Sequence, residues 1–338
     1  MHVGAIITVP ANHTSLGDLD QKNHSASIGV SRDFGTIDVL GQSLLERLRT
    51  KLLADGVNEI SVVKEEVSTT PEITTPQNSF WIQWDAILSR YLNLQARTIL
   101  LLRLGAYVEI DFADLIRAHR QTTSPMTQVF DRHGALDVVA IDGKEFSSAT
   151  GTYRARLRSL LFRQHRYAAP GYSNRLRSLK DLRRLITDAL SGDAALRPVG
   201  REIRPNVWAG SDAIIHDSAE IEGPAFIGAN TRVSADCSIS GMSSIERNCR
   251  LDYGTKVHQS SVLADTQLGI GLNVRHSVVA GNSLHHLGRN LVLRVDDGRI
   301  LKQAEDKRTF LDVARNFARR TNLIREESCQ PSSFDLHL

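Results

Sequence analysis

Hydrophobic residues recur at every sixth position between residues 215 and 263, and a small residue stands two positions before each of them. This period fits neither an α-helix nor a simple strand, and it is typical of a repeat in which each hexad forms one side of a three-sided coil of about eighteen residues. We expect the aliphatic series to point into the coil: Ile215, Ile221, Ile227, Val233, Ile239, Ile245, Leu251, Val257 and Leu263. The small series should occupy the corners: Ala213, Ala219, Ala225, Thr231, Cys237, Ser243, Cys249, Thr255 and Ser261.

The pattern resembles the left-handed parallel β-helix of hexapeptide-repeat proteins. Nine hexads predict three full coils, and residues 205–212 and 270–283 are expected to add partial ones. Ile270 follows Leu263 by seven residues, so we expect one extra residue, as a bulge or small loop, near residues 267–269. Such a repeat predicts a shape and self-association through open faces and ends, but no reaction.

The N-terminal half has the pattern of an α/β domain. Residues 3–9 form a continuous apolar run, which predicts a buried parallel strand. Residues 42–54 carry leucines on one helical face and end before Gly56, and residues 58–63 predict a second strand. This order of strand, loop, helix and strand indicates the start of a doubly wound sheet.

Weaker patterns predict the remaining elements. Helices are expected at residues 84–96, 113–120, 154–163, 178–190 and 307–320, and strands at residues 98–102, 126–130, 136–141, 291–295 and 299–301. The loop at 191–198 is the best boundary. The predicted organisation is an α/β domain over 1–195, a left-handed β-helix over 205–285 and a C-terminal extension with a helix over 286–338.

Composition narrows the class of protein. The 338 residues carry a formal net charge of +3, no stretch is long enough to span a membrane, and three cysteines do not make a disulfide framework. The N-terminus lacks the basic start of a signal peptide, so we expect a cytoplasmic protein. Basic residues gather between Arg154 and Arg184, where we expect a solvated helix face near the first coil rather than a phosphate or membrane site. No spacing indicates nucleic-acid binding.

An α/β domain followed by hexapeptide repeats resembles the sugar-nucleotide pyrophosphorylases, which join a sugar 1-phosphate to a nucleoside triphosphate. Residues 44–48 and 55–60 look like the first helix and second strand of that family, and residues 108–112 are similar to the segment after its metal-binding aspartate. Residues 149–153 resemble the sugar-site segment, so Gly151 and Tyr153 are candidate sugar contacts. Residues 171–182 resemble the end of the catalytic domain. The resemblance implies a GT-A- or Rossmann-like nucleotidyltransferase fold.

The residues that would perform catalysis depart from the family. Its phosphate-binding Gly-x-Gly-x-Arg loop is replaced by a segment that we interpret as a vestigial nucleotide loop: Pro10, Ala11, Asn12, His13, Thr14 and Ser15. Asp33 and Phe34 stand where the family has Pro-Lys, and Gly105 or Ala106 stands where it has its metal-binding aspartate. Near Ser173 we find no second metal carboxylate.

Nucleotidyl transfer depends on positioning and on neutralisation of phosphate charge by cations and Mg²⁺. The sequence therefore predicts a degenerate family member, with no cofactor, that acts as a regulatory, sensing or scaffold subunit in sugar-nucleotide or surface-polysaccharide biosynthesis. The implied partners are a sugar nucleotide or sugar phosphate, an active relative and further copies of the chain. The first alternative is a divergent but active enzyme that uses Mg²⁺.

The second alternative is a hexapeptide-repeat acyltransferase, a class that uses a histidine as general base between neighbouring coils. His258 follows the inward Val257 and should face outward, two to three coils from the basic residues. His285 and His286 are adjacent, but no acidic residue or cysteine lies at metal-ligand spacing, so we predict no metal site.

Overall fold

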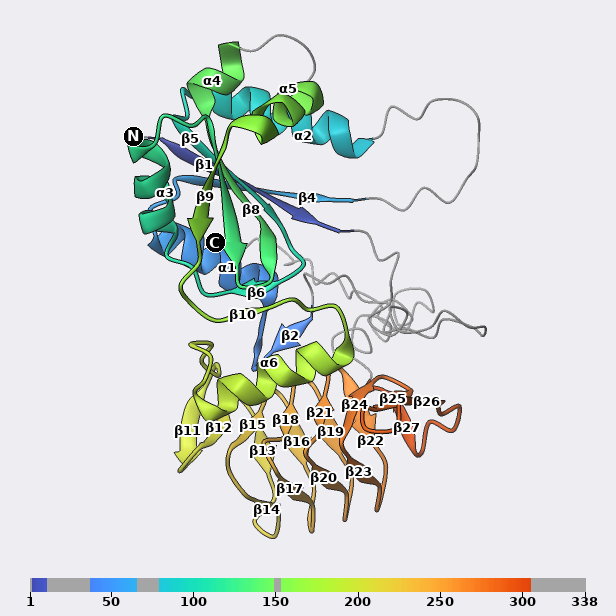
Figure 1. The fold of residues 1–338 in the computed structure, drawn as a ribbon. Coiled ribbons are helices and arrows are strands. Elements are labelled where there is room, and N and C mark those ends of the chain that lie inside the picture. Colours follow the sequence, from blue (N-terminus) through green and yellow to red (C-terminus); the bar gives the residue numbers. More distant parts are fainter. Residues whose placement is uncertain (1, 11–36, 66–78, 149–152, 305–338) are drawn as a thin grey trace, which may run out of the picture.

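The computed structural model of the chain describes residues 2–10, 37–65, 79–148 and 153–304 (Figure 1). The N-terminal part is built on a six-stranded sheet with the order β4-β1-β5-β8-β7-β9. Its strands are β1 (Val3–Val9), β4 (Glu59–Lys64), β5 (Thr98–Arg103), β7 (Met126–Asp131), β8 (Gly134–Asp142) and β9 (Gln164–Ala168). β1 is parallel to both β4 and β5, as the predicted start of a doubly wound sheet requires, whereas β8 is antiparallel to both of its neighbours, so the whole sheet is mixed. The short turn before Gly134 (φ 126°) makes β7 and β8 a hairpin, which requires antiparallel pairing.

Helices cover both faces of this sheet (Figure 1). They are α1 (Leu44–Ala54), α2 (Ser79–Asn93), α3 (Phe112–Gln121), α4 (Gly143–Ser148) and α5 (Tyr153–Leu160), which a 3-10 turn (Leu161–Arg163) extends. Leu52 of α1 and Leu115 of α3 pack with Ala5 on one face. Leu88 of α2 and Leu160 of α5 pack with Ile6 on the other. Alternate residues of β1 therefore serve opposite cores, as strand geometry requires.

Two short ribbons and one helix lie between this layer and the repeats (Figure 1). β2 (Asp38–Val39) and β3 (Gln42–Ser43) form a hairpin directly before α1, and Ser43 and Glu46 make the capping box that starts this helix. β6 (Tyr107–Val108) pairs with β10 (Ser173–Asn174). α6 (Leu179–Ser191) begins at the N-cap Ser178 and ends at Gly192 (φ 87°).

Residues 201–304, called here the repeat region, contain three parallel sheets that successive strands join in turn. The first sheet holds β12 (Val207–Ala209), β15 (Ala225–Ile227), β18 (Ser244–Ile245), β21 (Ser261–Val262) and β24 (Ser277–Ala280). The second holds β13 (Ile214–Ile215), β16 (Arg232–Val233), β19 (Arg250–Leu251) and β22 (Thr266–Leu268), and the third holds β14 (Glu220–Ile221), β17 (Ser238–Ser240), β20 (Lys256–His258) and β23 (Asn273–Arg275). Antiparallel strands flank them: β11 (Arg201–Arg204), β25 (Ser283–His286), β26 (Leu291–Arg294) and β27 (Leu301–Gln303). Pairing of each parallel strand with the third one after it is compatible with the predicted β-helix.

The predicted inward series is correct only as far as Val257. From Ile227 to Val257 each of its members is at most 1% exposed. Val262 then takes the inward place, because it pairs with Ile245, seventeen residues before it. Leu263 is buried on the outer side of the first sheet, so its assignment to the coil interior was wrong. The expected insertion near residues 267–269 was also wrong, since Leu268 continues the series and Ile270 is 75% exposed.

The shift arises at one corner of the coil. Between β17 and β18 the chain turns through Gly241 and Met242, both with positive φ, whereas between β20 and β21 it turns through Gln259 alone. One residue is therefore missing at this corner, and the small residue in the corner is Ser260 rather than Ser261, since Ser261 pairs with Ser244.

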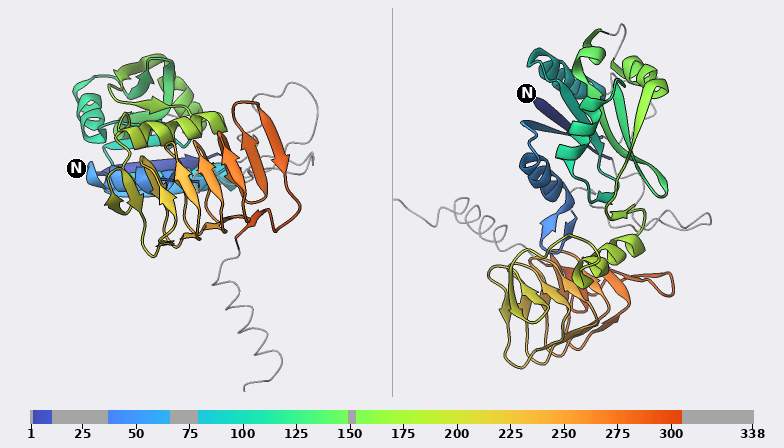
Figure 2. Two further views of the ribbon diagram at one scale, coloured as in Figure 1. Left: turned by 90° about the horizontal axis from the view of Figure 1, so that it is seen from below. Right: turned by 60° about the vertical axis from the view of Figure 1, so that its left-hand side comes forward.

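α6 connects the two parts of the molecule. Its apolar face, including Leu182 and Ile186, packs on the outer side of the first sheet against Phe226, Leu263 and Val278. Figure 2 shows the helix lying along the row of short strands. Burial of apolar side chains from both α6 and the first sheet thus holds the repeat region against the helix.

Most predicted elements are confirmed to within a few residues, including the strands near 291–295 and 299–301. The elements that were not predicted are β2, β3, α4, β6, β9, β10, β11 and β25. The helix expected over 307–320 lies outside the described residues. None of the helices in the described ranges is both long and apolar enough to cross a bilayer.

Candidate functional site

The carboxyl ends of β1, β4 and β5 meet at one edge of the mixed sheet, where ligands bind in open α/β folds. Pro10 follows β1 at this edge, and the other residues of the candidate nucleotide loop, Ala11 to Ser15, lie outside the described residues. Backbone bonds from Glu65 to Val9 and from Leu104 to Thr8 fix the three strand ends side by side.

Arg103 supplies positive charge at this edge. Its guanidinium binds the Glu65 carboxylate through two hydrogen bonds of 3.2 Å, and the pKa of Arg103 is raised mainly by this bond and to a lesser degree by the charges of Glu65 and Asp137. The arginine side chain is 51% exposed and that of Glu65 is 29% exposed. An exposed guanidinium at the ends of parallel strands can bind a phosphate group.

Gly105, at the first metal position of the resemblance, lies beside a carboxylate from another strand. A Cβ atom on Gly105 would lie 3.8 Å from Oδ2 of Asp137, an exposed residue of β8. Glu65 and Asp137 thus flank Arg103, and their charges are partly balanced by it. The guanidinium of Arg103 therefore lies between two carboxylates at this edge of the sheet.

The β6–β10 ribbon brings the two segments expected to carry metal ligands together. Tyr107, two residues after Gly105, pairs with Asn174, and Val108 pairs with Ser173. The proximity that the resemblance implies is therefore present. The side chains at these positions, however, are Gly105, Asn174 and Arg175.

Asn174 and Arg175 are both occupied by structural contacts. The Asn174 amide is 7% exposed and donates to the Tyr172 hydroxyl at 3.2 Å and to the Asp181 carbonyl at 3.0 Å. Arg175 donates to both carboxylate oxygens of Asp131, at 2.7 and 3.3 Å. These contacts join the β7–β8 hairpin and α6 to the ribbon.

The Asp131 carboxylate is held ionised by this arrangement. Burial alone would raise its pKa, but hydrogen bonds from Arg175, the His133 backbone and Ser173 outweigh burial and lower the pKa to about 2. Arg175 thus turns a buried carboxylate into half of an ion pair. Asp131 is committed to this pair and is not free to bind a metal ion.

These residues do not fit a Mg²⁺ ion, which prefers several oxygen ligands in octahedral geometry. Both positions that the resemblance assigns to metal carboxylates lack an acid, and Asp131 faces an arginine. Among the described residues no three acidic, histidine or cysteine side chains are grouped so as to hold a metal. We derive no metal-dependent step from this site.

The candidate sugar contacts remain predictions. Gly151 lies outside the described residues, and Tyr153 is the first residue of α5. The helix lies on the face of the sheet that carries α2 and α4 (Figure 1).

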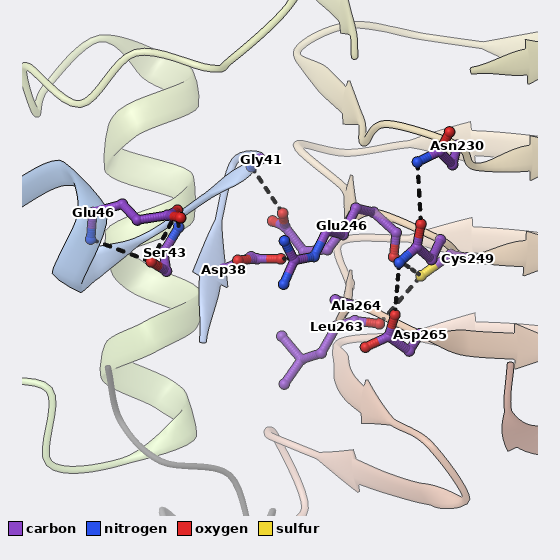
Figure 3. Close-up of polar contacts among 12 residues, drawn as sticks. Asp38, Gly41, Ser43, Glu46, Asn230, Glu246, Cys249, Leu263, Ala264 and Asp265 are labelled. Carbon is purple, nitrogen blue, oxygen red and sulfur yellow. Dashed lines mark hydrogen bonds and ion pairs between the residues drawn. The ribbon is translucent and has the colours of Figure 1, made fainter. Parts of the chain in front are cut away.

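A second polar site joins the β2–β3 hairpin to the repeat region (Figure 3). Glu246, next to the inward Ile245, is 0% exposed, and its two carboxylate oxygens accept the backbone N–H groups of Leu40 and Gly41 at 2.9 Å each. Gly41 has φ 90°, and a Cβ atom there would lie 2.9 Å from Phe226. Only glycine fits this turn without strain.

The charges around Glu246 come from both parts of the molecule. Burial raises the pKa of Glu246 to about 7, against the lowering effect of the two backbone bonds and of Arg47, while Asp38 raises it further. Arg247 binds the Asp38 carboxylate at 2.8 Å. Arg47 donates to the carbonyls of Val39 and Leu40 at 2.8 and 3.1 Å. The hairpin is therefore held to the repeat region by polar contacts of its turn, at Leu40 and Gly41, and of β2, at Asp38.

The basic residues between Arg154 and Arg184 do not form one surface. Arg166 stacks on the Phe130 ring, Arg175 binds Asp131, and Arg184 pairs with Asp188. Arg183 is 7% exposed and donates to the Met242 carbonyl at 2.8 Å.

The expected location of this cluster, near the first coil, was wrong for Arg183. Its guanidinium also reaches the Gly241 carbonyl at 3.4 Å, and a Cβ atom on Gly241 would lie within 3.0 Å of the His258 ring. α6 runs along several coils because its apolar face follows the first sheet, so the expected separation of two to three coils does not exist for this residue.

His258 lies on β20, half-buried, at the corner with the missing residue. Its Nδ1 atom lies 2.9 Å from the Ser240 hydroxyl oxygen, and its ring is 6.1 Å from that of His276. His285, on β25, is buried, and burial lowers the pKa of its imidazole. Ser240 thus orients the His258 imidazole through its Nδ1 atom.

Comparison with known proteins finds a partial likeness to one enzyme. No protein-family model matches the sequence. The chain is 35% identical over 83 residues to a UTP–glucose-1-phosphate uridylyltransferase of Synechocystis sp.. The match covers 24% of this chain and 21% of that protein. It supports a sugar nucleotidyltransferase-like region, and the mixed α/β sheet fits such a region.

Proposed function

We propose that the chain is a sugar nucleotidyltransferase-like protein with a degenerate catalytic site, which binds a sugar nucleotide or sugar phosphate without turning it over. It would serve as a regulatory, sensing or scaffold subunit in sugar-nucleotide or surface-polysaccharide biosynthesis. Its proposed organisation is a nucleotidyltransferase-like domain over 1–195, a left-handed β-helix over 205–285 and an extension over 286–338. Its partners would be an active relative and further copies of the chain, in the cytoplasm, where buried free thiols such as Cys237 and Cys249 persist.

One observation carries the proposal. The β6–β10 ribbon sets Gly105 and the Asn174–Arg175 pair side by side, where an enzyme of this class would need carboxylates for Mg²⁺. Asn174 instead holds Tyr172, and Arg175 holds Asp131. Since metal ions supply much of the charge neutralisation in phosphoryl-group transfer, replacement of both acids favours binding over catalysis.

The binding half of the proposal is tested at Arg103. Calorimetric titration with UDP-glucose should show binding that Arg103→Gln weakens about fivefold to tenfold, since the variant loses a charge-assisted bond to phosphate. Arg90→Gln is the matched control, because Arg90 pairs with Glu59 at the other end of β4 with nearly the same exposures, 52% and 30%. Equal weakening by both variants, or no binding of any sugar nucleotide, would contradict this site.

The Ser240–His258 contact favours one further candidate function, acyl transfer with His258 as general base. An imidazole that a hydroxyl orients at Nδ1 can act as a general base through Nε2. We expect His258→Ala to leave sugar-nucleotide binding intact. Micromolar binding of acetyl-CoA together with a transfer reaction that His258→Ala abolishes would favour the acyltransferase instead.

A further inference from the structure

β26 is an exposed apolar edge at the end of the repeat region away from β11 (Figure 2). Among the described residues this strand pairs with β25 alone. Leu291, Val292 and Leu293 are 45%, 41% and 47% exposed, so both faces of the strand are accessible. Proteins usually block such edges with charges, proline or a covering element, because an open apolar edge pairs with other strands.

We propose that β26 pairs antiparallel with β26 of a second copy of this chain, joining the two first sheets across a two-fold axis. This inference is independent of the proposed catalytic degeneracy. An antiparallel strand pair is self-complementary, so one sequence can supply both sides of the contact.

The backbone of β26 determines which groups are free to form this contact. The Val295 N–H donates to the Asn282 carbonyl at 2.9 Å, in the ladder that pairs Leu293 with Leu284. In an antiparallel ladder both polar groups of a residue face the same neighbour, and alternate residues face opposite neighbours. The N–H and C=O groups of Val292 and Arg294 therefore point to the open edge.

These groups select a register for the pair. A hydrogen-bonded pair can form only between residues whose N–H and C=O groups both point to the open edge. In the register that overlaps the whole strand, Val292 lies opposite Arg294 of the partner. The two such pairs would make about four new backbone hydrogen bonds. Leu293 then lies on the two-fold axis and meets its own copy in a close, non-hydrogen-bonded pair.

The charges at the two ends of β26 support the antiparallel arrangement. The exposed Arg289 lies in the turn directly before the strand, and the exposed Asp296 lies two residues after its end, so an antiparallel pair brings the arginine end of one copy to the acidic end of the other. Asp297 binds Arg299 at 2.9 Å within its own chain. Each end of the paired strands would thus bring an arginine near the acidic residues that follow the partner's strand, which favours the antiparallel arrangement.

Disulfide trapping tests the geometry. In a Cys329→Ser background, Leu293→Cys should form a disulfide-linked dimer under mild oxidation, because Cα atoms in a close antiparallel pair lie about 4.5 Å apart. Leu291→Cys is the control on the same strand and face, with 45% against 47% exposure. Its two copies would lie about 13 Å apart, too far for a disulfide. Equal cross-linking at residues 291 and 293 would overturn the proposed register.

Sedimentation velocity of the full chain tests the contact itself. The unaltered chain should dimerise at high micromolar concentration, and Val292→Pro should weaken the dimer at least about tenfold, because it removes an N–H that faces only the open edge. Thermal unfolding of Val292→Pro should stay close to that of the unaltered chain. A strictly monomeric chain would overturn the proposal. So would a dimer unaffected by Val292→Pro, which would point instead to the opposite end, where a hollow of about 490 Å³ is lined by Ile203, Ala213 and Ile215.

Discussion

Glu246 shows how a single residue can couple two distant segments. Its carboxylate accepts two backbone bonds from a hairpin more than two hundred residues earlier in the chain. In the sequence it is one acidic residue beside an inward aliphatic residue, a place where an exposed side chain is expected. Its burial could not be predicted, because it depends on the packing of the β2–β3 hairpin and α6 on the first sheet.

This carboxylate should make stability depend on pH in a specific direction. A carboxyl group whose pKa is raised in the folded state, here to about 7, binds more protons folded than unfolded, so its contribution to stability is lost as pH rises toward 7. Between pH 5 and 7.5 the free energy of unfolding of the unaltered chain should fall by about 2 kcal/mol relative to that of Glu246→Gln, because glutamine cannot titrate.

Urea unfolding of both proteins across this pH range measures the difference. Glu220→Gln is the control, because Glu220 is exposed in the same repeat region. Parallel pH profiles for the unaltered chain and Glu246→Gln would contradict the assignment of this titration to the buried carboxylate.

At the scale of elements, the six-residue period predicted the repeat strands correctly and missed one deleted residue. After Val257 two pairs of residues offer a small residue followed two positions later by an aliphatic one: Ser260 with Val262, and Ser261 with Leu263. This part of the pattern does not decide between them. The choice depends on α6, which buries Leu263 on the outer side of the first sheet.

The corner residues of the coil carry a second sequence pattern typical of the repeat. Asn230, Asn248 and Asp265 all have positive φ, a conformation that asparagine and aspartate tolerate, and their side chains bond to one another along the stack (Figure 3).

Two aspartate substitutions distinguish the registers. Leu268→Asp should destabilise the chain by at least about 3 kcal/mol, because it buries a charge among the inward residues. Ile270→Asp should stay within about 0.5 kcal/mol of the unaltered chain, since Ile270 is 75% exposed. Thermal or urea unfolding of the two variants gives the answer, and a larger loss of stability from Ile270→Asp would restore the predicted register, in which Ile270 points inward after one inserted residue.

At the scale of the whole molecule, the sequence pattern predicted an α/β part and a repeat region, but it did not predict how the two are joined. The apolar runs of β1 and β5 predicted the centre of the sheet, but the exposed β9 carries no hydrophobic pattern and was missed. The absence of acids at residues 105, 174 and 175 was visible in the sequence. The ion pair of Arg175 was not, because its partner Asp131 lies 44 residues away in the sequence and only the fold brings the two together.

We propose that this chain has a nucleotidyltransferase-like region but does not catalyse nucleotidyl transfer. Pyrophosphate release tests it most directly, measured with Mg²⁺ over a panel of nucleoside triphosphates and sugar 1-phosphates and with an active pyrophosphorylase as the positive control. We predict no release above the rate without protein for any pair, from a chain that is folded and binds a sugar nucleotide. Sustained turnover with any one pair would contradict the claim and establish a divergent active enzyme.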